Sequence, residues 1–189
     1  MQKTAVLIYQ SFCAFELSVA LESLALAEKE IVVFSKNKLP VQSEERLMVL
    51  PDRAIAEVDS AEFDSLLLTG AADIREAIED QEVIDFIKKF ADKIIGAISI
   101  APILLVKAGL LKGLPFMIGA NREELYEEGF KEEDLSHMIS WDDNLRNPVK
   151  NGYLISDNII TSVSYNFVHW GVAFARMLGI DIESKTFGV

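Results

Sequence analysis

The segment that most constrains the fold runs from Ile94 to Leu105 and reads IIGAISIAPILL. Its first five residues are apolar or small, which is typical of a strand buried on both faces, as in a parallel sheet covered by helices. Pro102 then stands where a helix would begin, because its fixed φ suits the first helical turn and its missing N–H costs nothing there. Ser99 therefore falls in a sharp turn between a buried strand and a helix.

Two interpretations of Ser99 follow from this position. A side chain on a strand-to-helix elbow projects at the carboxyl end of the sheet, beside a helix N-terminus, where proteins place nucleophiles. Serine is also a common N-cap residue, so an ordinary strand–helix junction would read the same way. The segment alone leaves both interpretations open.

Length and charge exclude several classes of protein. A chain of 189 residues, half of them apolar, fits one compact domain over residues 1–189. A net charge of −12 makes nucleic acid and acidic membranes poor partners. No apolar run is long enough to span a bilayer, and the N-terminus lacks the regions of a signal peptide, so we expect a cytoplasmic protein. One cysteine and two separated histidines exclude an internal disulfide and a zinc cluster, and we expect no cofactor.

Short apolar strands alternate with amphipathic helices along most of the chain. We predict strands at 4–9, 31–34, 63–69, 94–98 and 116–118, an edge pairing at 48–51, a hairpin of 153–155 with 158–161, and helices at 15–27, 80–90, 102–108, 122–128 and 165–178. This βαβ order predicts an α/β fold: one doubly wound, mainly parallel sheet with helices on both faces. The acidic runs between 123 and 134 are interpreted as solvated helix faces.

In such a sheet the ligand crevice lies at the carboxyl ends of the strands, near the point where the strand order reverses. This rule brings four segments around one site: 10–16, 70–73, 99–102 and 162–166. Asp73, Arg75 and Asn121 could supply polar contacts at its rim. They could equally be residues of solvated loops and helix caps.

Five short motifs occur in a fixed order. They are FCAFE at 12–16, FDSLLLTGA at 63–71, the elbow itself, AGLLKG at 108–113 and NIITS at 158–162. In order and spacing they resemble the ThiJ/PfpI superfamily, over about Ala5 to Leu178. The resemblance implies a flavodoxin-like fold of the class I glutamine-amidotransferase-like type, and it suggests a homodimer, since many relatives are dimeric.

The resemblance also implies a site. Relatives place a nucleophilic cysteine at the elbow, where this chain has Ser99, and approach it with a glutamate from the first helix, which corresponds to Glu16. Relatives usually have a Gly-Gly pair whose backbone N–H helps to form an oxyanion hole; here the pair is Gly70-Ala71, and alanine keeps the amide. The amide of Ile100 would be a further donor, although its bulky side chain would narrow the pocket mouth.

Two departures put catalysis in doubt. An alcohol is far less acidic than a thiol, so Ser99 needs a base in contact to become a nucleophile. Relatives with a full catalytic set carry a histidine shortly after the AGLLKG motif, but residues 117–121 contain none. Glu16 would accept a proton only weakly, and a core or surface role is expected for His137 and His169.

Glu16 and Cys13 can each be interpreted in two ways. Glu16 either points at Ser99 with a raised pKa, protonated and hydrogen-bonding across the crevice, or is an exposed helix-start residue favoured by the helix dipole. Cys13 either takes over the nucleophilic or redox chemistry, or is a buried, idle thiol that behaves as a small hydrophobe.

Three functions remain in order of preference. The first is a protein with a degenerate catalytic site, not a peptidase, that binds a small molecule or serves a regulatory or stress-related role. The second is a hydrolase or a glyoxalase- or deglycase-like enzyme on a small carbonyl, ester or amide, with Ser99 as nucleophile and Glu16 as acid and base. The third is a glutamine-amidotransferase-like subunit, which is weakest because that chemistry depends on the elbow cysteine and a histidine.

Overall fold

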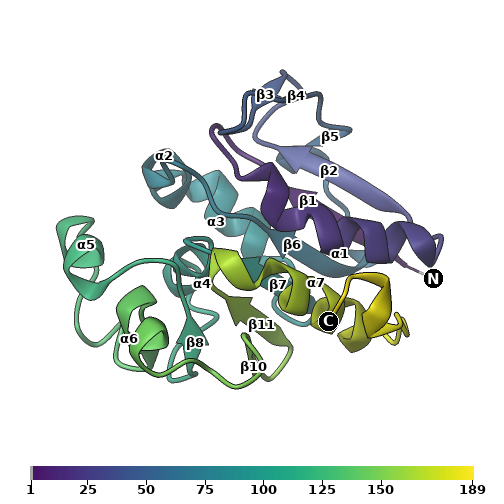
Figure 1. Ribbon diagram of the computed structural model, residues 1–189. Helices are drawn as coiled ribbons and strands as arrows, with labels where there is room; N and C mark the ends of the chain where they lie inside the picture. The colour runs from purple at the N-terminus through teal and green to yellow at the C-terminus, as the bar shows by residue number, and fades with distance from the viewer. Residues whose placement is uncertain (1) are drawn as a thin grey trace.

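A seven-stranded sheet forms the centre of the molecule in the computed structural model, which describes residues 2–189 (Figure 1). All neighbouring strands are parallel except the hairpin at one edge. In spatial order the strands are β10 (Leu154–Ser156), β11 (Ile159–Ser162), β7 (Ile94–Ile98), β6 (Phe63–Leu68), β1 (Lys3–Leu7), β2 (Ile31–Ser35) and β5 (Arg53–Ala54). The mainly parallel α/β sheet predicted from the sequence is confirmed.

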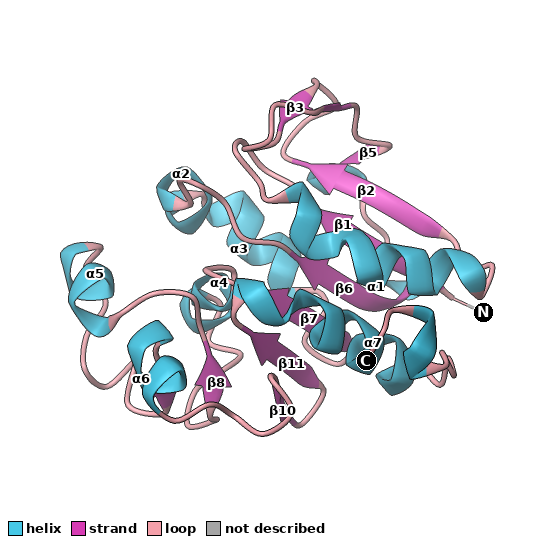
Figure 2. Ribbon diagram, in the orientation of Figure 1, coloured by secondary structure: helices cyan, strands magenta, loops and turns pink. Residues whose placement is uncertain are grey.

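Helices cover both faces of this sheet (Figure 2). On one face lie α1 (Ala14–Leu26) and α7 (Phe167–Met177), which pack against each other. The other face is covered by α3 (Gln81–Lys88) and α4 (Pro102–Lys107), and the short α2 (Arg75–Glu79) contacts both of them. Four short 3-10 turns lie at Ile55–Glu57, Ser60–Glu62, Ser164–Asn166 and Ser184–Thr186.

Alternation along the strands divides the core into two layers. Leu66 and Leu68 of β6 belong to the layer beneath α3 and α4, whereas Leu67 between them points to the layer beneath α1 and α7. All three side chains are fully buried. Both faces of the central strands are therefore apolar, which explains their continuous apolar sequence runs.

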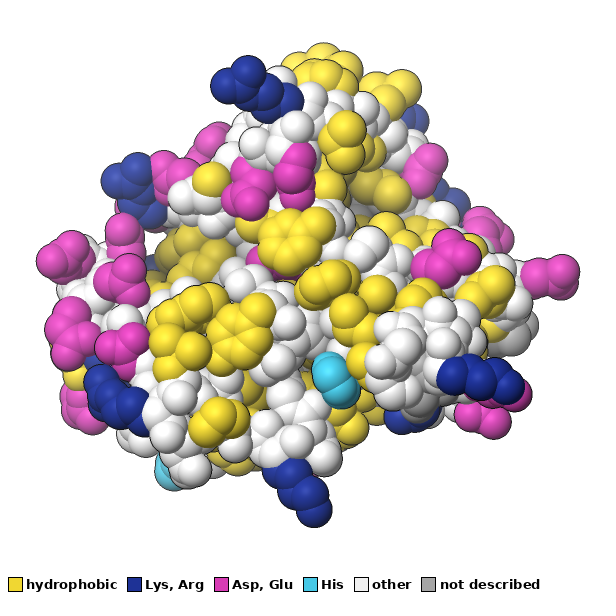
Figure 3. All heavy atoms as spheres, viewed as in Figure 1, with side chains coloured by type: hydrophobic (Ala, Val, Ile, Leu, Met, Phe, Trp, Pro, Cys, Tyr) yellow, Lys and Arg dark blue, Asp and Glu magenta, His cyan; other side chains and the backbone are white. Residues whose placement is uncertain are grey.

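Two small sheets lie outside the main one. β3 (Val41–Gln42) pairs with β4 (Met48–Val49), and β8 (Phe116–Met117) pairs with β9 (Met138–Ile139). The apolar run at 116–118 therefore does not continue the main sheet, although it follows the same sequence pattern. Its neighbours α5 (Arg122–Glu127) and α6 (Trp141–Arg146) complete a small lobe, and the acidic side chains of α5 face solvent as expected (Figure 3).

Strand β1 marks the position where the strand order reverses, since β2 lies on one side of it and β6 on the other. Parallel strands all end at the same edge of a sheet, so the loops after β1, β6 and β7 converge there. Within residues 2–189, no helix is long and apolar enough to cross a membrane.

The contact between α1 and α7 depends on a glycine. A Cβ built on Gly171 would lie 2.7 Å from the backbone nitrogen of Ala20 and 3.0 Å from Cγ1 of Val19. Real Cβ atoms do not approach backbone that closely, so any side chain at position 171 would force the two helices apart. The position of α1 relative to the sheet, and of the residues at its start, depends on this packing.

We expect Gly171→Ala to lower the free energy of unfolding by about 1–3 kcal/mol, since overpacking a tight interface strains it. Urea denaturation of both proteins measures this difference. His169→Ala is the matched control, because His169 is exposed on the same helix and should change stability by less than about 0.5 kcal/mol. Equal stability of Gly171→Ala and the parent would show that the helices move apart without cost.

Candidate functional site

Ser99 occupies a strained turn at the end of β7. Its φ is +61°, in the left-handed region that residues other than glycine rarely adopt. The turn is fixed from two sides: the Ser99 N–H donates to the Ser162 carbonyl at 2.9 Å, and the Gly119 N–H donates to the Ser99 carbonyl at 2.7 Å. The N-cap of α4 is Ala101, so the interpretation of Ser99 as a helix N-cap is wrong.

Glu16, in the first turn of α1, is buried with only 1% of its surface exposed. Its Oε2 accepts the Gly70 N–H at 2.7 Å and lies 3.1 Å from the Thr69 hydroxyl. The Ser99 hydroxyl is hydrogen-bonded to the same carboxyl. The interpretation of Glu16 as an exposed helix-start residue is therefore wrong, and three adjacent parallel strands bring Glu16, Gly70 and Ser99 together.

Burial raises the pKa of the Glu16 carboxyl, against the opposing hydrogen bonds from Gly70, Ser99 and Thr69. The Thr69 hydroxyl donates to the Cys13 carbonyl at 2.6 Å, the shorter of its two contacts. One hydrogen cannot serve both contacts fully, so the Thr69 hydroxyl stabilises an ionised Glu16 less than a dedicated donor would. Desolvation is the largest cause and sets the upward direction of the pKa shift.

Gly70 has no side chain, which leaves room for the Glu16 carboxyl and the Ser99 hydroxyl to approach each other. A Cβ at this position would lie 2.8 Å from Glu16 Oε2, 2.8 Å from Ser99 Oγ and 2.7 Å from Ser99 Cβ. Any side chain here would separate the two functional groups. Position 70 thus needs a glycine because Glu16 and Ser99 approach its Cα closely, and not because of an unusual φ.

A pocket of about 380 Å³ opens above Ser99, which is half-buried on its wall. The Gly70 amide is already bonded to Glu16, so it is not free to hold an oxyanion. The amides of Ala71 and Ile100 also border the pocket and make no hydrogen bond within residues 2–189. The pocket is therefore lined by two residues with unbonded amides and by the Ser99 hydroxyl, with Arg75 and the carboxylates of Asp73, Glu124 and Glu128 around them.

The part of the chain that the structure describes places no histidine beside Ser99. Gly119 and Ala120 lie against the pocket, in the segment after the AGLLKG motif where catalytic relatives are expected to carry a histidine. His137 and His169 are both exposed, and neither lines this pocket. The same described residues hold no group of three or more potential metal ligands.

The other candidate residues lie at or beyond the rim. Cys13 is buried beside Glu16 but does not line the pocket; burial and the neighbouring Glu44 raise the pKa of its thiol well above the ordinary range. Asp73 lines the pocket and is paired with Arg75, which lowers the pKa of its carboxyl to about 2. Asn121 caps α5 and accepts from the Asp142 amide, away from the pocket.

The sequence did not reveal two residues that shape the site, Thr69 and Gly119. Thr69 is fully buried and joins Cys13 to Glu16 through one hydroxyl. A Cβ at Gly119 would lie 3.1 Å from the Ser99 backbone, so this glycine lets the loop after β8 approach the elbow. A polar residue that ends an apolar strand was the available signal for Thr69. Of the predicted segment 162–166, Ser162 reaches the elbow, whereas Tyr165 and Asn166 line a separate surface pocket.

The fold and this site together define a flavodoxin-like α/β protein with a strand-to-helix nucleophile elbow. The model of the DJ-1/PfpI family matches residues 2–166. The chain belongs to the DJ-1/PfpI family, and the resemblance inferred from its motifs is confirmed. Among curated proteins, the search found no significant match to this chain.

Solved structures give the same fold at low sequence identity. A DJ-1 superfamily protein from Agrobacterium tumefaciens is 18% identical with a TM-score of 0.80, over 99% of this chain and 95% of that one. A DJ-1 superfamily protein from Salmonella typhimurium, solved as a cysteine-to-alanine mutant, is 22% identical with a TM-score of 0.75, over 99% and 96%. Oxidised DJ-1 from Toxoplasma gondii is 18% identical with a TM-score of 0.74, over 98% and 95%.

The raised pKa of Glu16 predicts a pH-dependent cost of folding. Unfolded Glu16 ionises near its ordinary pKa of 4.5, whereas folded Glu16 stays protonated to higher pH. The contribution of Glu16 to stability is therefore fully present below pH 4.5 and is lost as the pH rises through the folded pKa. In urea denaturation, the free energy of unfolding of the parent relative to Glu16→Gln should fall as the pH rises above 4.5. A constant difference between the two proteins would contradict a neutral, buried acid.

The buried thiol predicts slow alkylation. At neutral pH we expect iodoacetamide to label Cys13 at least about tenfold more slowly than a free model thiol, because the raised pKa leaves little thiolate and burial blocks access. Mass spectrometry of intact protein over time measures the rate, and protein unfolded in urea provides the control. Labelling as fast as the model thiol would restore Cys13 as a reactive centre.

Proposed function

We propose that this DJ-1/PfpI-family protein has a degenerate catalytic site and binds a small molecule in the Ser99 pocket without turning it over. The observation that carries this proposal is the partner of Ser99. Among the described residues its ionisable neighbour is Glu16, a carboxyl whose Oε2 already accepts the Gly70 N–H, and residues 117–121 supply no histidine. An alcohol needs a strong base in contact to become a competent nucleophile.

The groups that remain suit binding of a neutral carbonyl oxygen, since Asp73, Glu124 and Glu128 on the same wall disfavour an anion. The free amides of Ala71 and Ile100 and the Ser99 hydroxyl all border one pocket. Preorganised N–H groups hold an oxygen acceptor whether or not a reaction follows. A pocket of about 380 Å³ lies at the small end of the range for small-molecule sites.

A second candidate is an enzyme on a small carbonyl, ester or amide, with Ser99 as nucleophile and Glu16 as acid and base. The strained φ of Ser99 favours it, since such strain is kept mainly at functional sites. Against it stands the segment 117–121, which offers no histidine. The amidotransferase-like alternative also lacks a histidine in this segment. A homodimer, a cytoplasmic location and a regulatory or stress-related role stay predictions.

Turnover and binding are tested separately. For turnover, the parent, Ser99→Ala and Ser99→Cys are assayed with methylglyoxal and p-nitrophenyl acetate. We expect the parent and Ser99→Ala to give the same background rate, and Ser99→Cys to react faster, because a thiol at the elbow needs no strong base. Turnover by the parent that disappears in Ser99→Ala would establish the enzyme instead.

For binding, isotope-labelled parent protein is titrated with acetamide, and amide signals are followed by NMR. The signals of Ala71 and Ile100 should move with a saturable dependence, while that of Asn37, on a different loop, should not. Absence of any shift at Ala71 and Ile100, together with background turnover, would contradict a binding function for this pocket.

A further inference from the structure

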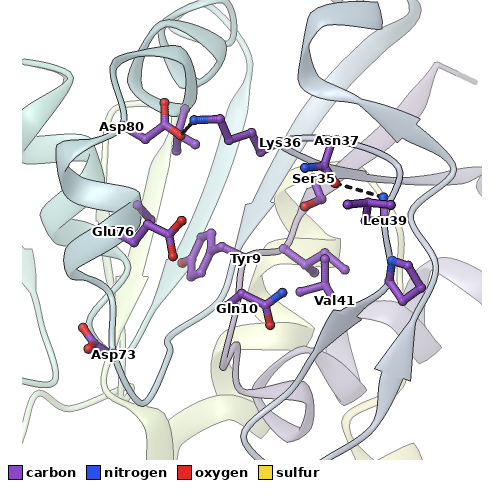
Figure 4. A pocket seen from close by; sticks show the side chains of 14 residues that line it. Tyr9, Gln10, Ser35, Lys36, Asn37, Leu39, Val41, Asp73, Glu76 and Asp80 are labelled. Carbon is purple, nitrogen blue, oxygen red and sulfur yellow. Dashed lines mark hydrogen bonds and ion pairs between the residues drawn. The ribbon is translucent and has the colours of Figure 1, made fainter.

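A second pocket, of about 220 Å³, lies at the carboxyl ends of β1 and β2 (Figure 4). Its walls come from the loop after β1, the loop after β2, and helix α2 with the start of α3. Asp73 alone is shared with the pocket above Ser99. The two pockets therefore lie side by side at the sheet edge but present different groups to a ligand.

Ser35 gives this pocket a polar group without a partner. The residue ends β2 and is 95% buried, with 5% of its surface exposed. Its hydroxyl forms no hydrogen bond with any residue from 2 to 189, and it points into the pocket (Figure 4). Among the described residues, Ser23 Oγ is the one buried side-chain oxygen without a partner, so the unbonded Ser35 Oγ is open to the pocket and a polar ligand atom can reach it.

The charges around the pocket leave one carboxylate uncompensated. Lys36 forms an ion pair with Asp80, and Asp73 forms one with Arg75. Glu76 makes no ion pair or side-chain hydrogen bond within the described chain, although Lys36 attracts it weakly. Its carboxylate is directed toward the Tyr9 ring at the pocket edge (Figure 4). The free charge is thus negative, in a protein whose net charge of −12 also draws cations toward it.

The rest of the lining is mainly apolar, with Gln10 and Asn37 as further polar residues. The Tyr9 hydroxyl donates to the Thr69 carbonyl, which holds the ring in place along one side. Val41 lies across from Tyr9 (Figure 4), and Pro40 also lines the pocket. An aromatic ring beside a carboxylate favours a cation, and the apolar walls favour a hydrocarbon body next to it.

We propose that this pocket is a second binding site, which takes a small molecule with a protonated amine on an apolar body. Glu76 supplies the counter-charge, the Ser35 hydroxyl accepts a hydrogen bond from the ammonium group, and Tyr9, Pro40 and Val41 enclose the apolar part. The site does not depend on Ser99, and it could be occupied whether or not the neighbouring pocket has any activity.

Benzylamine is the probe, with benzyl alcohol and benzoate as neutral and anionic counterparts of similar size. NMR titration of isotope-labelled protein should show saturable shifts at Ser35 and Val41 with benzylamine, and much weaker binding of the other two. Glu76→Gln should raise the Kd for benzylamine about fivefold, as expected for loss of a partly exposed ion pair. Glu79→Gln, on the same helix but outside the pocket, should leave the Kd unchanged.

The Ser35→Ala variant tests whether the Ser35 hydroxyl binds the ligand or stabilises the fold. Because the Ser35 hydroxyl has no partner within the described residues and is open to the pocket, its removal should leave the urea midpoint unchanged, while the Kd for benzylamine increases. A lower urea midpoint would mean that the hydroxyl supports the fold and would overturn its role as a ligand group. Equal affinity for benzyl alcohol, tighter binding of benzoate, or shifts at Ala71 and Ile100 instead of Ser35 would overturn the proposal.

Discussion

The contact between the Glu16 carboxyl, the Gly70 amide and the Ser99 hydroxyl joins three elements at one point. Helix α1 supplies the acid, the end of β6 supplies the amide, and the elbow after β7 supplies the alcohol. The contact exists because β1, β6 and β7 are parallel neighbours whose carboxyl ends share one edge of the sheet. It also needs the packing of α1 against α7 at Gly171, which sets where the first turn of α1 lies.

The same contact restricts what the site does. Burial raises the pKa of this acid, and its Oε2 is bonded to the Gly70 amide beside the alcohol. By occupying the Gly70 amide, the acid also removes one donor that a carbonyl oxygen would otherwise use. Sulfur in place of the Ser99 oxygen would be affected less, because a thiol ionises without a strong base.

Much of the fold could be predicted from sequence because its strands are buried on both faces and carry continuous apolar runs. The runs at 63–69 and 94–98 became β6 and β7 nearly residue for residue. The peripheral elements gave weaker signals. Helices α2 and α6 have only five and six residues, too few to show a helical period, and β8 has an apolar pattern like that of a central strand although it pairs elsewhere.

The family motifs predicted which residues form the site, but they did not predict which backbone amides there are free. Glu16 and Ser99 were placed by their motifs, and their contact followed from strand order. The Gly70 amide is already bonded to Glu16, whereas the amides of Ala71 and Ile100 form no hydrogen bond within residues 2–189. These details depend on small differences in atomic position, which no sequence pattern reports. The pocket beside β2 was missed for another reason: Ser35 and Glu76 lie about forty residues apart in unremarkable polar contexts.

The left-handed turn at Ser99 has an evolutionary consequence. A backbone held in this conformation costs of order 1 kcal/mol or more, and the hydrogen bonds from Ser99 to Ser162 and from Gly119 to Ser99 maintain it. Cysteine and serine differ by a single atom and are one nucleotide apart in the genetic code. A lineage that keeps this costly backbone is therefore one point mutation away from a thiol at the elbow.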